Sequence, residues 1–277
     1  MAVLDPQTQL SYVATVAKQT ALMAQAYRSW PAGFWERPTF CAGWKAVDAV
    51  AHLATGGDFY AQAIRAGRAG TPQLPWGVAD AAGFRTARTA AVQKLLDGGP
   101  AAILEGFEQS AAQLQQVLES LQVADLSREA WHPRGLIPIG SWIGMRLTEL
   151  GIHDWDIRQP HEAQAALSPT VLPALLAVIP EMQMQFLAQR LSDGMDGVYV
   201  LRAGETSWGF TVRGKSVTYH AKAPDTYDAC LSADPEGLIL LTVGRANPEA
   251  RLRNATLTVT GNADQGQQFC ATLFRAF

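Results

Sequence analysis

The hydrophobic pattern of the chain changes its period once, near residue 195, and this change constrains the fold most. Before that point apolar residues recur at three- and four-residue spacing, which predicts helices. After it, apolar and polar residues alternate between turn glycines, which predicts antiparallel strands. We therefore expect two domains, a helical one over residues 1–187 and a smaller α+β one over residues 188–277.

The helical part predicts a four-helix bundle with one long connection. Its first helix begins after the capping residue Asp5 and ends before Pro31. Further helices are expected in "GWKAVDAVAHLATGGDFYAQAIRAG", in a stretch ending at "DGGP", in "PAAILEGFEQSAAQLQQVLESLQ", and from a cap at Ser141 to Gln159. Residues 123–140 contain several prolines and glycines and are expected to form the crossing loop.

The second domain is expected to begin with hairpins. The run "GVYVLRAGETSWGFTVRGKSVTYHAKA" alternates in polarity, with turn glycines at Gly204 and Gly214. A helix is expected in "DPEGLILLTVGRA", another strand in "ATLTVTGN" and a closing amphipathic helix in "DQGQQFCATLFRAF". Together these elements predict an α+β domain.

Composition argues against several classes of protein. The formal net charge of -3 gives no basic surface for nucleic acid. No apolar run approaches the roughly 20 residues that span a bilayer, and "MAVLDPQTQL" lacks the charged start and apolar middle of a secretory signal. The three cysteines, Cys41, Cys230 and Cys270, lie far apart and leave one unpaired in any disulfide scheme. We expect a cytoplasmic protein, monomeric or homodimeric, without membrane or nucleic-acid partners.

The stretch "TELGIHDWDIRQP" places Glu149, His153 and Asp156 at positions i, i+4 and i+7. This spacing puts all three side chains on one face of the last bundle helix. On the second helix, His52 lies in "VAHLA", where we expect the helix to face the bundle interior. Two imidazoles and one carboxylate are a common ligand set for catalytic zinc, with one position left for water or substrate. Nickel, iron or manganese would also accept them.

Each of these residues also has a purely structural interpretation. The i,i+4 acid and imidazole could form an ordinary surface pair, and His52 could be a hydrogen-bonded core histidine. Asp156 could cap a backbone group or pair with Arg146 or Arg158. Asp48, one turn before His52, could orient that ring or merely belong to the first helical turn. Spacing alone leaves these alternatives open.

Both motifs resemble signatures of a known family. "FCAGWKAVDAVAHLA" resembles the Cys-x-Gly-Trp…Asp-x-x-x-His-Leu signature of the mycothiol-dependent maleylpyruvate isomerase family, a branch of the DinB-like metal-binding bundles. "RLTELGIHDWD" resembles the second signature, Glu-x-x-x-His-x-x-Asp, and "LLTVGRANPEA" and "ATLTVTGNAD" are similar to the sterol-carrier-like module that follows the bundle. The resemblance covers nearly the whole chain. It implies His52, Glu149 and His153 as metal ligands and Asp156 as the adjacent acid.

The resemblance also implies a chemistry. A divalent metal, Zn²⁺ by preference, would deprotonate an external thiol, mycothiol of actinobacteria, and the thiolate would attack an electrophilic small molecule. Cys41 is then not needed as a nucleophile and is expected to pack under Trp44. Lys45 and Val47 depart from the first signature. We therefore favour an S-transferase, in detoxification or natural-product (antibiotic) biosynthesis, over a cis-trans isomerase of the maleylpyruvate type.

Further residues are expected near the site. Arg245, in "TVGRA", is expected to contact the polar end of the thiol, with a surface arginine near a helix end as the alternative. The loop side chains expected to line the electrophile pocket, or else to plug the bundle end, are Trp76, Trp131 and His132. His161 and His220 are expected at the surface.

Two other functional classes remain open at this level. The sterol-carrier-like domain could bind an apolar ligand while the bundle serves as its scaffold, which would make the chain a non-catalytic binding protein. The metal ligands would then have no purpose. Alternatively, a metal-bound water could be the nucleophile of a hydrolase. Dependence of turnover on a thiol separates hydrolysis from the thiol chemistry.

Overall fold

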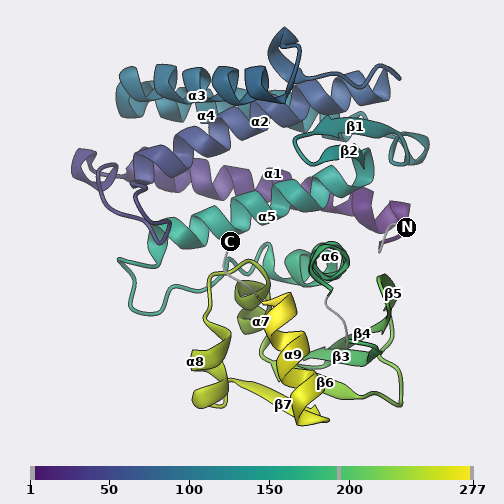
Figure 1. The fold of residues 1–277 in the computed structure, drawn as a ribbon. Coiled ribbons are helices and arrows are strands. Elements are labelled where there is room, and N and C mark those ends of the chain that lie inside the picture. Colours follow the sequence, from purple (N-terminus) through teal and green to yellow (C-terminus); the bar gives the residue numbers. More distant parts are fainter. Residues whose placement is uncertain (1–3, 192–194, 275–277) are drawn as a thin grey trace. The chain divides into compact units, whose positions relative to one another are not determined.

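The fold is that of a computed structural model, which describes residues 4–191 and 195–274 (Figure 1). The chain divides into two compact units, residues 4–174 and residues 175–277. The boundary expected from sequence, between residues 187 and 188, falls inside helix α6 (Leu172–Arg190). Most of α6 belongs to the second unit, where its buried Gln183 donates a hydrogen bond to the Thr242 hydroxyl at 2.8 Å.

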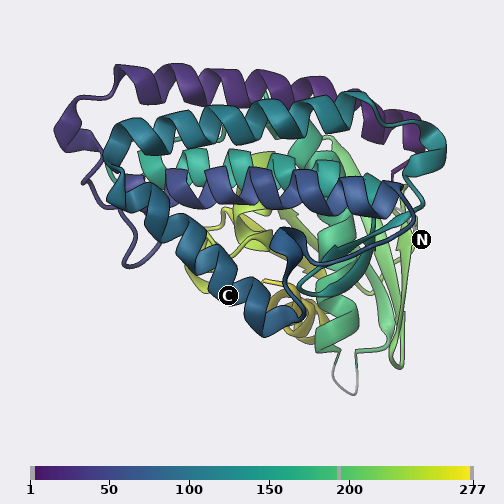
Figure 2. The ribbon, with the colours of Figure 1, turned by 90° about the horizontal axis from the view of Figure 1, so that it is seen from above.

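The first unit is helical. Its α-helices are α1 (Pro6–Ser29), α2 (Ala46–Arg68), α3 (Ala81–Asp97), α4 (Gly99–Glu119) and α5 (Ile139–Arg158). Three short 3-10 helices connect them: η1 (Ala32–Phe34), η2 (Pro75–Gly77) and η3 (Val123–Asp125). Helix α2 packs against α4 and α5, and α1 packs against the same two helices, while α3 lies against α2 and α4 (Figures 1 and 2). The predicted four-helix bundle is therefore confirmed, with α3 added outside it.

The starts of two helices can be traced to hydrogen bonds. Asp5 caps α1 as predicted, because its carboxylate accepts two main-chain N–H groups of the first turn at 3.0 Å each. The predicted cap at Ser141 is wrong, since α5 already begins at Ile139. The N–H of Ile139 donates instead to the carbonyl of Arg128 at 2.8 Å, so the preceding loop satisfies this end of the helix.

The expected crossing loop over residues 123–140 is more ordered than predicted. It contains a hairpin of β1 (Glu129–His132) and β2 (Gly135–Pro138), and β1 packs against α2. A four-residue strand ending in proline carries too little alternation to be recognised from sequence. The hairpin requires a close approach at Gly67 of α2, where an added Cβ would lie 2.5 Å from the carbonyl oxygen of Glu129.

We expect Gly67→Ala to destabilise the protein by about 1–3 kcal/mol, because the added methyl group forces α2 and the hairpin apart. Chemical denaturation of the variant and the wild type measures this difference. Gly33→Ala is the matched control, since a Cβ at Gly33 meets nothing within 4 Å. Equal stability of the Gly67 variant and the wild type would contradict the close packing.

The second unit is built on one sheet. Its strands are β3 (Gly197–Ala203), β4 (Thr206–Arg213), β5 (Ser216–His220), β6 (Ala229–Ala233) and β7 (Leu257–Gly261). They lie in the order β5-β4-β3-β6-β7, and only the central pair β3 and β6 is parallel. The remaining helices are α7 (Pro235–Thr242), α8 (Pro248–Arg253) and α9 (Ala263–Leu273). The predicted α+β class is confirmed.

The hairpin turns of this unit follow the prediction. Gly204 and Gly214 have φ values of +60° and +55°, which glycine adopts without a steric penalty. Helix α9 covers the sheet, and its Phe269 ring stacks on Tyr199 with centroids 4.2 Å apart. The last three residues of the predicted closing helix, 275–277, lie outside the described residues.

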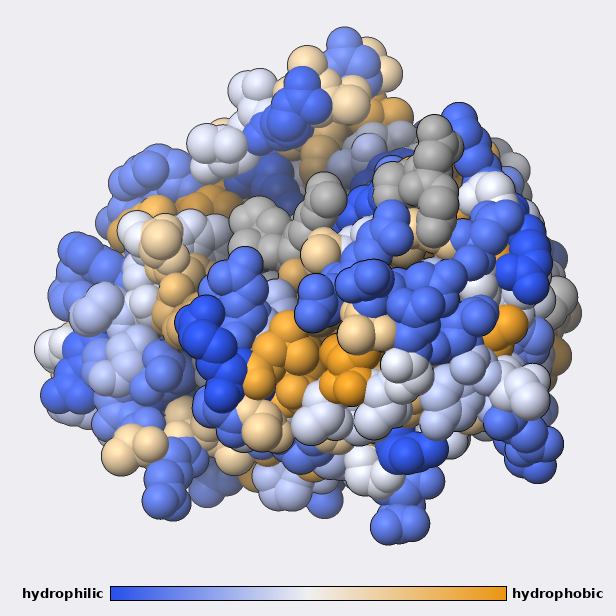
Figure 3. Space-filling view, turned by 60° about the horizontal axis from the view of Figure 1, so that its bottom comes forward, coloured by the Kyte–Doolittle hydropathy of each residue, from blue (hydrophilic) through white to orange (hydrophobic). Residues whose placement is uncertain are grey.

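The surface drawn in Figure 3 is largely hydrophilic, with hydrophobic residues gathered near its middle. The large apolar side chains that are exposed among the described residues are Leu22, Phe40, Val123, Leu136 and Tyr227. None of the described helices combines the length and apolar character required to cross a bilayer.

Candidate functional site

Two helices of the bundle bring the predicted site residues together. His52 projects from α2, and Glu149, His153 and Asp156 project from one face of α5. The carboxylate of Glu149 lies between the two imidazoles. Its Oε2 is 2.9 Å from His52 Nε2 and 3.7 Å from His153 Nε2. Prediction from helical spacing therefore matches the observed clustering of these side chains.

Asp156 supports His153 from behind. It is fully buried, and its Oδ2 accepts the Nδ1–H of His153 at 2.9 Å and the thiol of Cys41 at 3.2 Å. This places a proton on His153 Nδ1 and turns Nε2 toward Glu149. The alternative pairing of Asp156 with Arg146 or Arg158 is not what the described hydrogen bonds show: Arg158 bonds Asp154 and Glu162, and Arg146 bonds the Leu53 carbonyl.

Cys41 does not occupy the position expected from sequence. It is half-buried, and its sulfur lies against Asp156 instead of simply packing under Trp44. The sulfur, His153 and Asp156 form a second group whose ligand-type atoms lie within 4.8 Å of one another. Both the thiol and the imidazole donate to the same carboxylate oxygen, so we interpret this group as a hydrogen-bonded support for His153.

His52 is held differently from His153. Its Nδ1 accepts a hydrogen bond from Nη2 of Arg88 on α3 at 3.2 Å. Asp48 does not orient this ring, because its Oδ2 accepts the N–H of Lys45 at 2.8 Å and so caps the start of α2. Lys45 in turn pairs with Glu36 at 2.8 Å. Sequence reasoning missed Arg88, which lies in a stretch of α3 without any recognised motif.

Trp44 covers both imidazoles. Its ring stacks on His153 at an interplanar angle of 22°, with centroids 5.7 Å apart, and lies 5.0 Å from the His52 ring. The side chain of Glu149 is 38% exposed, whereas His52 and His153 are 22% and 11% exposed. The triad of His52, Glu149 and His153 is therefore open to small molecules mainly on the Glu149 side.

Burial, hydrogen bonds and neighbouring charges together set the pKa values of His52, Glu149 and His153. Burial lowers the pKa of His52 and outweighs the opposite effect of Glu149. Burial alone would raise the pKa of Glu149, but the hydrogen bond from His52 and the nearby cationic groups hold it below its usual range. Burial would likewise lower the pKa of His153. The hydrogen bonds with Asp156 and Cys41, together with the charges of Glu149 and Asp156, outweigh burial and raise this pKa to about 9.

The three groups fit a divalent metal. The ligand-type atoms of His52, Glu149 and His153 all lie within 4.8 Å of one another. Ligand atoms in a tetrahedral zinc site, at roughly 2.0–2.1 Å from the metal, are about 3.3 Å apart. The observed separations of 2.9 and 3.7 Å from Glu149 to the two imidazoles lie on either side of that value.

Metal uptake at pH 7.5 is expected to release about one proton, because His153, with a pKa of about 9, must lose its Nε2 proton to become a ligand. The release should vanish as the pH rises above this pKa. Calorimetric titration in buffers of different ionisation enthalpy measures it. Asp156→Asn removes the negative charge that helps to raise the pKa of His153, so this variant should release fewer protons and bind metal about 10- to 100-fold more weakly. Proton release unchanged between pH 7.5 and 10 would contradict the assignment.

The predicted loop aromatics form one cluster. Trp76, Trp131 and His132 are half-buried and pack around Phe59, with ring centroids 6.5, 6.4 and 6.0 Å from it. Trp76 also stacks on Phe84 of α3. These contacts support the alternative that the loop aromatics close the end of the bundle, and lining of an electrophile pocket stays a prediction.

The remaining candidates are Arg245, His161 and His220. Arg245 follows α7 in the second unit, where its Nη1 donates to the Val243 carbonyl at 3.2 Å. His161 and His220, expected at the surface, are half-buried and hydrogen-bonded to the Pro38 carbonyl and the Thr211 hydroxyl.

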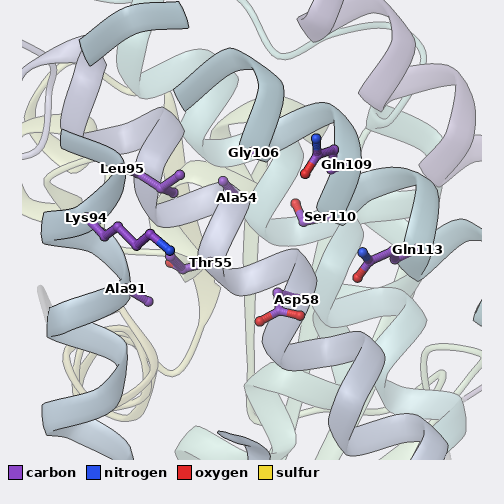
Figure 4. A pocket seen from close by; sticks show the side chains of 10 residues that line it. All are labelled: Ala54, Thr55, Asp58, Ala91, Lys94, Leu95, Gly106, Gln109, Ser110 and Gln113. Carbon is purple, nitrogen blue, oxygen red and sulfur yellow. The ribbon is translucent and has the colours of Figure 1, made fainter. Parts of the chain in front are cut away.

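A separate hollow of about 260 Å³ lies between α2, α3 and α4 (Figure 4). Lys94 of α3 reaches toward Thr55 of α2 across it, and Asp58 lies at its edge. The carboxylate of Asp58 already has hydrogen-bond partners. Its Oδ2 accepts the indole N–H of Trp76 at 2.7 Å, and both of its oxygens accept the Gln62 amide N–H. This hollow therefore offers no uncommitted acid for chemistry.

Comparison with known proteins decides the family. The model of the mycothiol maleylpyruvate isomerase N-terminal domain matches residues 16–158, which is more than half of the chain. The chain belongs to the mycothiol-dependent maleylpyruvate isomerase family. The model of the SCP-2 sterol transfer family matches residues 187–274 in addition. No curated protein matches the chain.

Solved structures support the fold of the family over nearly the whole chain. A crystal structure of a histidine-to-alanine mutant of mycothiol-dependent maleylpyruvate isomerase is 16% identical, with a TM-score of 0.61, and covers 94% of this chain and 95% of its own. A second crystal structure of mycothiol-dependent maleylpyruvate isomerase is 17% identical, with a TM-score of 0.59, and covers 89% and 92%. Family membership identifies the chain as a thiol-using enzyme, an isomerase or a transferase.

Proposed function

We propose that this chain is a metal- and mycothiol-dependent cis-trans isomerase of the maleylpyruvate type. The observation that carries the proposal is the convergence of His52, Glu149 and His153 from two helices within 4.8 Å. We assign these three residues as ligands of a divalent metal, by preference zinc, and Asp156 as the acid that orients His153. Sequence analysis placed S-transfer first. The matched family and the two similar crystal structures favour isomerisation instead.

The donor set determines what the site can do. Two neutral imidazoles and one carboxylate leave a bound divalent metal with a net positive charge, which would keep a thiol deprotonated at neutral pH. Asp156 holds one proton of His153 at Nδ1, so Nε2 is the nitrogen that would bind the metal once its own proton is lost. Trp44 stacks on the His153 ring and contacts the His52 ring, so it shields part of each imidazole from water.

The reaction follows from a thiolate near a conjugated double bond. The sulfur adds to one alkene carbon while the π electrons move onto the conjugated carbonyl oxygen. The former double bond is now single and rotates. Return of the electrons expels the thiolate and leaves the trans alkene, so no thiol is consumed. In an S-transferase the carbon–sulfur bond would persist. Arg245 remains our proposed contact for the polar end of the thiol.

The fate of the thiol tests the proposal. Zinc-loaded protein is mixed with maleylpyruvate and a tenth of an equivalent of mycothiol, and both compounds are followed by proton NMR. We expect complete conversion to the trans isomer with the thiol recovered. Consumption of one thiol per electrophile would make the enzyme a transferase, with detoxification or antibiotic biosynthesis as its setting. Turnover that is independent of thiol would overturn both assignments.

A further inference from the structure

The hydrogen bond between Arg88 and His52 fixes where the proton of His52 resides. A guanidinium has only donors, so His52 Nδ1 must accept the bond from Arg88 Nη2 at 3.2 Å. The single proton of the neutral ring then lies on Nε2, which is 2.9 Å from Glu149 Oε2 and donates to it. The nitrogen that faces the triad therefore carries a proton instead of a lone pair.

The two imidazoles are thus prepared in opposite ways. His153 donates Nδ1–H to Asp156, so it would bind a metal through Nε2 by releasing the Nε2 proton, without rearranging the proton on Nδ1. For His52 to bind a metal through Nε2, its proton must transfer to Nδ1, where it would point at an N–H of Arg88. The positive charge of Arg88 would also repel the metal. Arg88 must therefore leave His52 when the site is loaded.

Arg88 also lines a pocket. This hollow of about 500 Å³ lies along α3 and is also lined by Arg85, Phe84 and Val92. The lining includes two arginines and no acid, together with apolar side chains. Such a pocket favours a small carboxylate with an apolar body. A guanidinium can form two parallel hydrogen bonds with the carboxylate, and the apolar side chains can pack against the rest of the ligand.

We propose that Arg88 couples metal binding to anion binding. Before the metal binds, Arg88 blocks the metal-accepting form of His52. Metal binding at Nε2 moves the ring proton to Nδ1 with no net proton exchange at this residue, and frees Arg88 to bind an anionic group in the α3 pocket. Metal and anion therefore increase each other's affinity by the same factor. The inference rests on the proposed metal ligands.

Zinc affinity tests the coupling without any turnover. Zinc dissociation constants are measured by competition with a chromogenic chelator, with and without benzoate as the probe anion. Without benzoate, Arg88→Met is expected to bind zinc about 10-fold more tightly than wild type, because no bond to His52 must be broken. Benzoate is expected to tighten zinc binding about 5-fold in wild type and to have no effect in Arg88→Met.

Arg85→Met is the matched control, since it removes a charge from the same pocket without touching His52. It should leave zinc affinity unchanged without benzoate and weaken the benzoate response. Equal zinc affinity of Arg88→Met and wild type would overturn the coupling alone. So would a benzoate effect that persists in Arg88→Met, because benzoate would then bind the metal directly. Failure of every variant, wild type included, to bind zinc would overturn the metal site itself.

Discussion

Glutamine at position 149 is expected to lower zinc affinity roughly 100- to 1,000-fold. Apparent binding free energies of protein zinc sites of about 10–16 kcal/mol, divided among four ligands, assign about 2.5–4 kcal/mol to each one. Glu149→Gln keeps the size of the side chain and its contact with His52, but removes the negative charge that both imidazoles face. Thiol-dependent turnover should fall with metal content. Elemental analysis and chelator competition measure zinc content and affinity, and the NMR assay measures thiol-dependent turnover.

The control for this variant is Glu105→Gln. Glu105 is an exposed carboxylate on α4 whose partner is Gln109, so the variant should keep full metal content. A thermal unfolding curve measured without metal separates ligand loss from misfolding, because the glutamine variant should remain folded. Full zinc content and full turnover in Glu149→Gln would remove Glu149 from the ligand set.

Alanine at position 142 is expected to cost about 3–5 kcal/mol of folding stability. Trp142 is fully buried on α5, the helix that carries three of the site residues. Its ring contacts those of Phe59, Tyr60 and His132 at centroid distances of 5.4, 4.8 and 5.4 Å. Truncation leaves a cavity between α2, α5 and the hairpin, and urea denaturation measures the loss.

Two further variants serve as controls for the stability loss of Trp142→Ala. Trp142→Phe keeps an aromatic ring in the same contacts, so it should be clearly less destabilising than the alanine variant. Leu136→Ala changes a side chain that is 50% exposed in the hairpin and should stay within about 0.5 kcal/mol of wild type. If Trp142→Ala were as stable as Leu136→Ala, the packing of α5 against α2 would be looser than described.

Helical spacing accounts for what could be predicted of the site. Glu149, His153 and Asp156 share a face because side chains four and three residues apart must do so. His52 could be predicted as a further site residue because it lies on the part of α2 that was expected to face the bundle interior. Arg88 could not be predicted. Its helix is mostly exposed on the outside of the bundle, and its importance arises only from the contact with His52 across helices.

The parts of the fold that escaped prediction depend on contacts distant in sequence. Strand β6 is only five residues long, and it is stabilised between β3 and β7 by pairing that no local pattern reveals. Helix α6 contains Pro180 and crosses the division between the units, and its Gln183 bonds Thr242, 59 residues further along the chain. Cys41 likewise contacts an acid 115 residues further along the chain.

His52 and Glu149 are separated by 97 residues. A metal that joins them would cross-link the native chain and would find no comparable site in the unfolded chain. Free metal at 100 times its dissociation constant stabilises such a protein by about 2.7 kcal/mol. Cleavage by proteases that attack the opened chain would slow in proportion to the fall in its population. The supply of metal in the cell would then determine how long each polypeptide survives, as well as whether it turns over substrate.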